Sequence, residues 1–176
     1  MNAALRFSTV AVVLATAFLV PSARAANLKD ELLRDWLEMK ETMHKLANEM
    51  PEEKYGYKST PPQRDFGQQV LHVATANVIN LRFVRGKAVA PAIDRNLKGK
   101  AAVIKAMDDS FDYGTALIKE LTDQTLTETV ETNAFLGPSS RARVIWFLLG
   151  HSWDIYGQMV VYLRLNGGVP PASQRP

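Results

Sequence analysis

Few residues in this chain can take part in metal or acid–base chemistry. The 176-residue sequence contains no cysteine, which excludes disulfides, thiolate metal sites and a thiol nucleophile. Histidine occurs at three positions, His44, His72 and His151. The sequence has no glycine-rich phosphate loop, nucleophile elbow or His-Glu-x-x-His pattern. A reactive site must therefore be built from imidazole, carboxylate, hydroxyl and amide groups.

One of these histidines, His151, interrupts an apolar stripe. Steps of three or four residues along this stretch give Val144, Leu148, His151, Ile155, Gln158 and Tyr162. Residues at this spacing share one face of a helix, so the pattern predicts that His151 points into the protein core. A second stripe, on a separate predicted helix, consists of His72, Ala76, Ile79 and Phe83.

Two inward-pointing imidazoles allow two interpretations. If they face each other inside a helix bundle, they can share a divalent metal ion. Alternatively, each is a neutral core histidine that donates a hydrogen bond to a backbone carbonyl. In either case the amide of Gln158, on the same face, can hydrogen-bond His151. The third histidine, His44, lies beside the inner stripe of the first predicted helix and is interpreted as a flank or surface residue.

Hydrophobic periodicity predicts four amphipathic helices that position these residues. They span about residues 28–50, 63–84, 100–122 and 138–166. Gly167 is expected to stop the last helix in a left-handed conformation. The segment 85–99 has no sustained period and is too long for a tight hairpin, whereas 125–137 is expected to be a second loop. The prediction is an all-α four-helix bundle with a long crossover between the second and third helices.

The first 25 residues have the order of a secretory signal peptide. Arg6 is followed by an apolar run over 7–20 and by the small-residue pattern that ends at Ala25. A permanent membrane anchor is the alternative, but this run is shorter than the roughly 20 residues that a spanning helix needs. We therefore expect cleavage after Ala25, a single mature domain over 26–176, and export to the periplasm or the extracellular space without stable membrane insertion.

Charge gives little reason to expect nucleic-acid binding. The formal net charge is +3, from 21 basic and 18 acidic residues. Loss of Arg6 and Arg24 with the signal peptide leaves 19 basic residues, so the mature charge is +1. Nucleic-acid-binding proteins normally cluster a larger basic excess on one face. Three further arginines either line an anion pocket at the end of the bundle or pair with surface carboxylates: Arg141, Arg143 and Arg164.

The C-terminal part of the chain resembles the signature of the DinB-like family. Residues 151–171 read HSWDIYGQMVVYLRLNGGVPP. The family pattern is a histidine, a second histidine four residues later, Gly-Gln, and an ending similar to Leu-Arg-x-x-Gly-x-x-Pro-Pro. Residues 50–58 resemble the family's first interhelical loop, 66–74 its second helix with the first ligand, and 110–113 part of its third helix. The similarity covers nearly all of the mature chain in the same order.

This resemblance implies an up-down-down-up four-helix bundle, often a homodimer, with a three-histidine site for nickel or zinc. Some relatives are metal-dependent transferases or isomerases. His72 and His151 match the first two histidines, but the third position is Ile155. A branched hydrocarbon has no lone pair to donate to a metal ion. Asp154 is a possible third contributor, although a supporting or surface role is the plainer interpretation.

Two functional hypotheses follow from the resemblance. In the first, the chain is an exported DinB-like protein with a degenerate metal site, in which nickel or zinc is absent or weakly bound. It then acts as a non-catalytic module that binds a small molecule or a partner protein. In the second, it is a divalent-metal-dependent transferase or hydrolase-type enzyme with an altered site.

Overall fold

Four long helices make up most of the protein. The computed structural model describes residues 27–174, so the predicted signal peptide lies outside the described residues. The long helices are α1 (Leu28–Glu49), α2 (Phe66–Leu81), α3 (Lys100–Glu120) and α5 (Arg141–Leu165). The prediction of a mostly helical, all-α protein is therefore confirmed.

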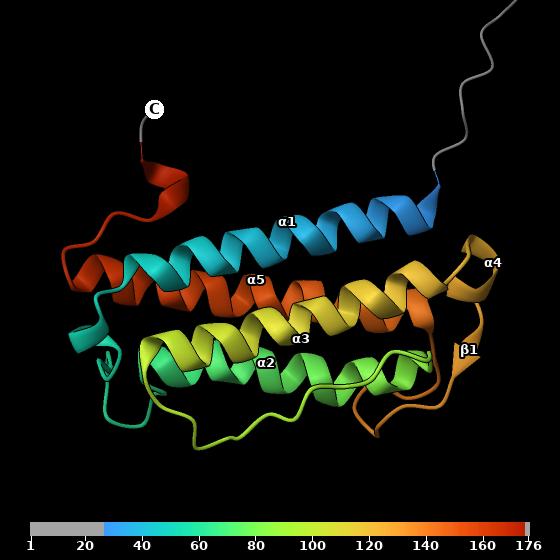
Figure 1. Ribbon diagram of the computed structural model, residues 1–176, viewed down its shortest axis with the longest axis horizontal. Coiled ribbons are helices and arrows are strands. Elements are labelled where there is room, and N and C mark those ends of the chain that lie inside the picture. Colours follow the sequence, from blue (N-terminus) through green and yellow to red (C-terminus); the bar gives the residue numbers. More distant parts are fainter. Residues whose placement is uncertain (1–26, 175–176) are drawn as a thin grey trace, which may run out of the picture.

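The long helices pack so that each contacts two others. α1 packs against α3 and α5, and α2 packs against the same two helices. In Figure 1, α2 and α3 run in one direction, and α1 and α5 run in the opposite direction. The segment 85–99 runs back along the bundle to join the end of α2 to the start of α3. This return path places the connection beside α2.

Side-chain caps determine where the helices begin. Asp65 forms a capping box with Gln68 at the start of α2, with hydrogen bonds of 2.7 and 2.9 Å. The side chain of Ser140 accepts a hydrogen bond of 3.2 Å from the backbone N–H of Arg143 at the start of α5. These caps start the two helices three residues later than the periodicity predicted. At its other end, α5 stops before Gly167, whose φ of 80° is the predicted left-handed stop.

The stretch predicted as a second loop contains short elements. A one-turn helix, α4 (Asp123–Leu126), overlaps its start and has a capping box between Thr122 and Thr125. The strand β1 (Thr129–Val130) then pairs antiparallel with β2 (Ser139–Ser140). Elements of two to four residues are too short to produce a hydrophobic period, so the prediction missed them. The described residues also form three 3₁₀ turns, η1 (Glu52–Lys54), η2 (Arg82–Val84) and η3 (Pro171–Ser173).

Arg141 holds together the end of the bundle near these short elements. Its Nε donates to the carbonyl of Val84 at 2.8 Å, and its Nη1 donates to the carbonyl of Thr125 at 3.0 Å. The guanidinium also forms an ion pair with Glu128. Arg143 donates from Nη1 to the carbonyl of Leu136 at 2.7 Å. Both guanidinium groups therefore bind groups of the protein itself. For Arg141, the ion pair with Glu128 agrees with the sequence alternative of pairing with a surface carboxylate.

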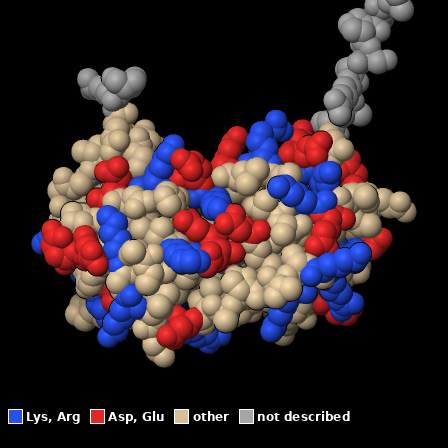
Figure 2. All heavy atoms as spheres, in the orientation of Figure 1, with Lys and Arg blue, Asp and Glu red and all other residues tan. Residues whose placement is uncertain are grey.

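The outer surface of the bundle mixes charges of both signs. On the face drawn in Figure 2, lysine and arginine side chains are interspersed with aspartate and glutamate. None of the helices within residues 27–174 combines the length and apolar character needed to cross a lipid bilayer.

Trp36 is the largest side chain of the core and depends on a close approach of α3. Its indole is fully buried, packs against Phe111 with ring centroids 5.0 Å apart, and donates a 2.8 Å hydrogen bond to the Phe111 carbonyl. Gly114 lies directly against this ring. A Cβ added at Gly114 would lie 2.3 Å from Cζ2 of Trp36. Only glycine therefore allows α3 to approach the indole this closely.

We predict that Gly114→Ala destabilises the protein by about 1–3 kcal/mol, because the added methyl group forces the indole or α3 to move. Urea unfolding followed by circular dichroism measures this change in the free energy of unfolding. Gly150→Ala is the matched control, because a Cβ at this exposed position in α5 meets no atom within 4 Å. The control is expected to gain up to about 1 kcal/mol from helix propensity. Unchanged stability of Gly114→Ala would contradict the proposed packing constraint.

Candidate functional site

His72 of α2 and His151 of α5 face each other in the interface between the two helices. Their ring centroids are 4.9 Å apart and the ring planes meet at 82°, so one edge points at the other face. Both residues are half-buried. The structure thus brings together the two imidazoles that the sequence placed on inward-pointing stripes.

One imidazole nitrogen in this pair has no partner. Nε2 of His151 is buried and forms no hydrogen bond with the described residues. The ring lies nearly parallel to Phe147, at 10° and 6.3 Å between centroids, and Phe147 in turn packs near Phe135. A buried polar atom without a partner costs free energy. Nε2 of His151 is therefore a hydrogen-bonding atom that the described residues leave unsatisfied.

An aliphatic side chain occupies the position where the family resemblance implies a third metal ligand. Ile155 lies one turn beyond His151 on the same face of α5 and is 2% exposed. Within residues 27–174, no group of three or more histidine, cysteine, aspartate or glutamate side chains is arranged to hold a metal ion. Catalytic zinc sites use three protein ligands. Two imidazoles and a hydrocarbon do not fit such a centre.

Asp154 and Gln158 bond to each other rather than to the imidazoles. Nε2 of Gln158 donates to Oδ2 of Asp154 at 3.2 Å, and Oε1 of Gln158 accepts from Nε2 of Gln69 at 2.8 Å. The predicted hydrogen bond between Gln158 and His151 is therefore wrong, because both ends of the Gln158 amide are engaged elsewhere. Asp154 is exposed on α5, in keeping with its surface interpretation.

The surroundings keep both imidazoles uncharged at neutral pH. Burial lowers the pKa of His72 to about 4; the positive charge of Arg64 and the neighbouring His151 act in the same direction, and Asp154 opposes them. Burial also lowers the pKa of His151, opposed by Asp154 and assisted by Arg64. Arg64 is therefore close enough to influence both rings.

His44 lies in a different helix interface from this pair. It belongs to α1, and its Nδ1 lies 2.8 Å from Oδ2 of Asp108 on α3. The His44 side chain is 40% exposed. This position on the flank of the α1–α3 interface agrees with the interpretation of His44 drawn from the sequence.

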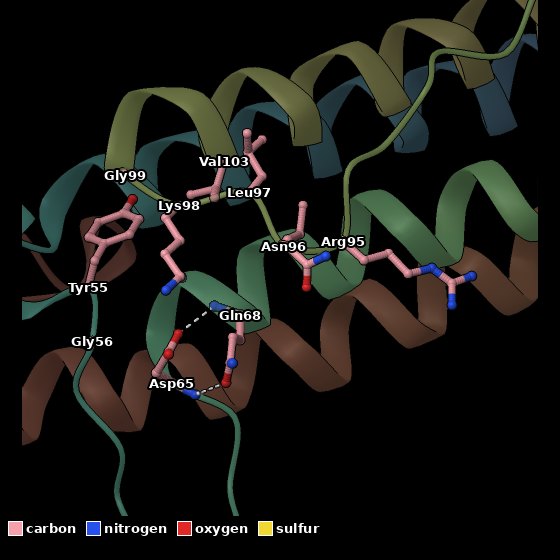
Figure 3. A pocket seen from close by; sticks show the side chains of 12 residues that line it. Tyr55, Gly56, Asp65, Gln68, Arg95, Asn96, Leu97, Lys98, Gly99 and Val103 are labelled. Carbon is pink, nitrogen blue, oxygen red and sulfur yellow. Dashed lines mark hydrogen bonds between the residues drawn. The ribbon is translucent and has the colours of Figure 1, made fainter.

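A groove and a cavity lie along α2 next to His72. The groove is lined by Arg64, His72 and Arg95 together with Gln68, Leu71, Thr75 and Ile79. Through Gln68, Leu71 and Arg95 it adjoins a cavity of about 380 Å³ between the start of α2, the first loop and the end of the crossover (Figure 3). Sequence reasoning did not identify Arg64 or Arg95, because Arg64 lies off the apolar stripes of the predicted helix 63–84 and Arg95 lies in the crossover, which has no sustained period. Only the fold brings these arginines to one groove.

Comparisons with known proteins agree on one family. The family model described as the DinB superfamily matches residues 36–159. The fold is similar to that of a DinB-like protein from Bacillus cereus, with a TM-score of 0.68, 21% identity, and coverage of 81% of this chain and 95% of the other. A DinB-like protein from Bacillus subtilis gives a TM-score of 0.63, 15% identity, and coverage of 82% and 99%. No match was found among curated proteins.

The lowered pKa of His72 predicts a loss of stability in mild acid. Between pH 6.5 and about 4 the unfolded chain binds a proton at His72 that the folded protein excludes. The free energy of unfolding should therefore fall as the pH is lowered through this window. Because the ring is only half-buried, the contribution of His72 to this slope should lie below the limit of about 1.4 kcal/mol per pH unit for one proton.

Urea unfolding at a series of pH values, with His72→Gln measured in parallel, tests this prediction. The variant should lose less stability than the parent protein between neutral pH and pH 4. A proton NMR titration should give a His72 midpoint near 4. A midpoint near the ordinary value of 6.5, or identical pH profiles for the two proteins, would contradict it.

Proposed function

The chain belongs to the DinB superfamily, and on that premise we propose that it is a non-catalytic module that binds a small molecule or a partner protein and whose metal site has degenerated. The observation that carries the proposal is the 4.9 Å pair of His72 and His151 with a buried Ile155 at the third ligand position. The helix directions in Figure 1 support the up-down-down-up bundle implied by the family resemblance.

Several features of the site disfavour a bound divalent cation. The two imidazoles supply two nitrogen donors, and Ile155 places hydrocarbon where a third ligand would lie. An apolar wall also removes the solvation that a bare cation needs. The guanidinium charge of Arg64 acts on both rings and would repel a second positive charge. Nickel or zinc is therefore expected to bind weakly or not at all.

The same features favour a small molecule with a polar group. A neutral imidazole offers one N–H donor and one acceptor nitrogen, and Nε2 of His151 is buried without a partner. The adjoining groove adds the hydrocarbon of Leu71 and Ile79. A ligand with a polar atom at the imidazole pair and an apolar body along α2 would match both the hydrogen-bonding imidazoles and the hydrocarbon of the groove.

The proposal also includes export and self-association. The order of basic, apolar and small residues over 1–25 supports export to the periplasm or the extracellular space. The family resemblance supports a homodimer. The alternative, a metal-dependent transferase or hydrolase-type enzyme, needs a third ligand. Asp154, the nearest candidate in sequence, accepts a hydrogen bond from Gln158.

Metal content after purification without an affinity tag tests the proposal directly. We expect nickel and zinc well below one equivalent per chain by elemental analysis. One equivalent of either metal, lost in both His72→Ala and His151→Ala, would overturn the degenerate-site proposal and favour the enzyme alternative.

A gain-of-function variant provides the converse test. Ile155→His should raise the affinity for nickel or zinc by roughly 100-fold or more, because it restores a third imidazole one turn from His151 on the same helix face. Val161→His is the matched control, because it adds one histidine to an exposed position of the same helix. Competition titration with a chromophoric chelator measures both. Equal affinities in the two variants would show that position 155 does not face the imidazole pair.

A further inference from the structure

Two arginines on the groove beside His72 are not neutralised by the described part of the chain. Arg64 lies just before α2, and Arg95 lies in the crossover. Neither guanidinium forms an ion pair or a side-chain hydrogen bond with residues 27–174. This contrasts with Arg141, which is held by Glu128 and two backbone carbonyls. A free guanidinium presents N–H donors in a planar fork that matches a carboxylate or a phosphate.

The position of Arg64 is fixed by the bundle itself. The hydroxyl of Tyr162 on α5 donates a 3.0 Å hydrogen bond to the backbone carbonyl of Arg64. Asp65, the next residue, caps α2 through its side chain. The backbone that carries the Arg64 guanidinium is therefore anchored at the mouth of the groove that His72 lines. A ligand would meet this arginine without first having to order a loop.

The adjoining cavity adds to the positive charge. Lys98 lines it, and in Figure 3 its side chain extends from the crossover towards the start of α2, while Arg95 extends along α2. Asp65 is the one acidic residue among those that line the cavity and the groove, and its Oδ1 already accepts the backbone N–H of Gln68. The lining of the groove and the cavity therefore contains three cationic side chains and one carboxylate, which is engaged in capping.

Part of the wall between these charges is apolar. Leu71 is 5% exposed and Val103 is 1% exposed, and Leu97 and the ring of Tyr55 complete this side of the cavity. A cavity of about 380 Å³ lies within the range of roughly 300–1,000 Å³ that small-molecule sites occupy. Such a surface holds a hydrocarbon or aromatic group, and it would not hold a bare inorganic ion tightly.

We infer that the groove and the adjoining cavity, together called the cleft, bind a small amphipathic oxyanion. Arg64 and Arg95 hold its carboxylate or phosphate, and its apolar body lies on Leu71 and the neighbouring cavity wall. The assignment rests on the proposed small-ligand function and names the ligand class. The neutral imidazole of His72, which lines the same groove, supplies an additional hydrogen bond to the ligand.

Three probes of similar shape separate the effect of charge from that of apolar contact. Phenyl phosphate, phenylacetate and 2-phenylethanol are titrated into the purified isotope-labelled protein, and backbone amide shifts are followed by NMR. We expect both anions to shift the amides of Gln68, Leu71 and Arg95, and to bind at least about tenfold more tightly than the alcohol. Comparing the two anions shows whether the site prefers a carboxylate or a phosphate head.

Charge-removing variants locate the binding group. Arg64→Gln and Arg95→Gln should each weaken anion binding by about tenfold or more, and leave the affinity for the alcohol unchanged. Arg34→Gln is the matched control, since it removes the same charge from an exposed position of α1. The control should bind both anions like the parent protein.

Different measurements test the oxyanion ligand and the degenerate metal site. Alcohol binding in the cleft as tight as anion binding, or variants that bind anions like the parent protein, would overturn the oxyanion assignment and leave a small-ligand site. If none of the three probes shifts the backbone amide signals of the cleft, the oxyanion assignment is overturned as well. The degenerate metal site is decided separately by the metal content and by Ile155→His.

Discussion

The packing of α2 against α5 is the constraint on which the rest of the site depends. It places two imidazoles from distant parts of the chain 4.9 Å apart. The same interface contains the hydrogen bond that the side-chain amide of Gln69 donates to that of Gln158, and the hydrogen bond that Tyr162 donates to the backbone carbonyl of Arg64, just before α2. These contacts fix how far one helix can slide along the other, so the edge-to-face imidazole pair and the groove beside it have one arrangement.

Burial and charge act in the same direction at this interface. Removing the imidazoles from water disfavours their protonated forms, and the guanidinium of Arg64 adds to this effect. An environment that opposes positive charge on a ring also opposes a bound metal cation unless enough ligands compensate for the lost hydration. With Ile155 in the third position, that compensation is incomplete. The groove beside the pair is therefore better suited to a negative group than to a positive one.

A fold and the chemistry of a site place different demands on a sequence. The structural likeness to two bacillar DinB-like proteins persists at 21% and 15% identity, because a helix bundle needs a pattern of buried hydrophobic residues more than particular side chains. A metal site needs particular side chains, so a single substitution is enough to remove a ligand. Membership of the superfamily therefore determines the scaffold, whereas the activity must be argued from the residues at the site.

The sequence alone determined the helices and the inward direction of His151, because both depend on residues within a few turns of one another. It did not reveal the partners of Gln158, the short strands β1 and β2, or the approach of Arg64 and Arg95 to one groove. Those features join segments far apart in the chain, and the hydrophobic period of one helix does not show which distant segments it contacts. Only the packed tertiary structure determines which side chains meet, because helix contacts and the path of the crossover are set by the whole core.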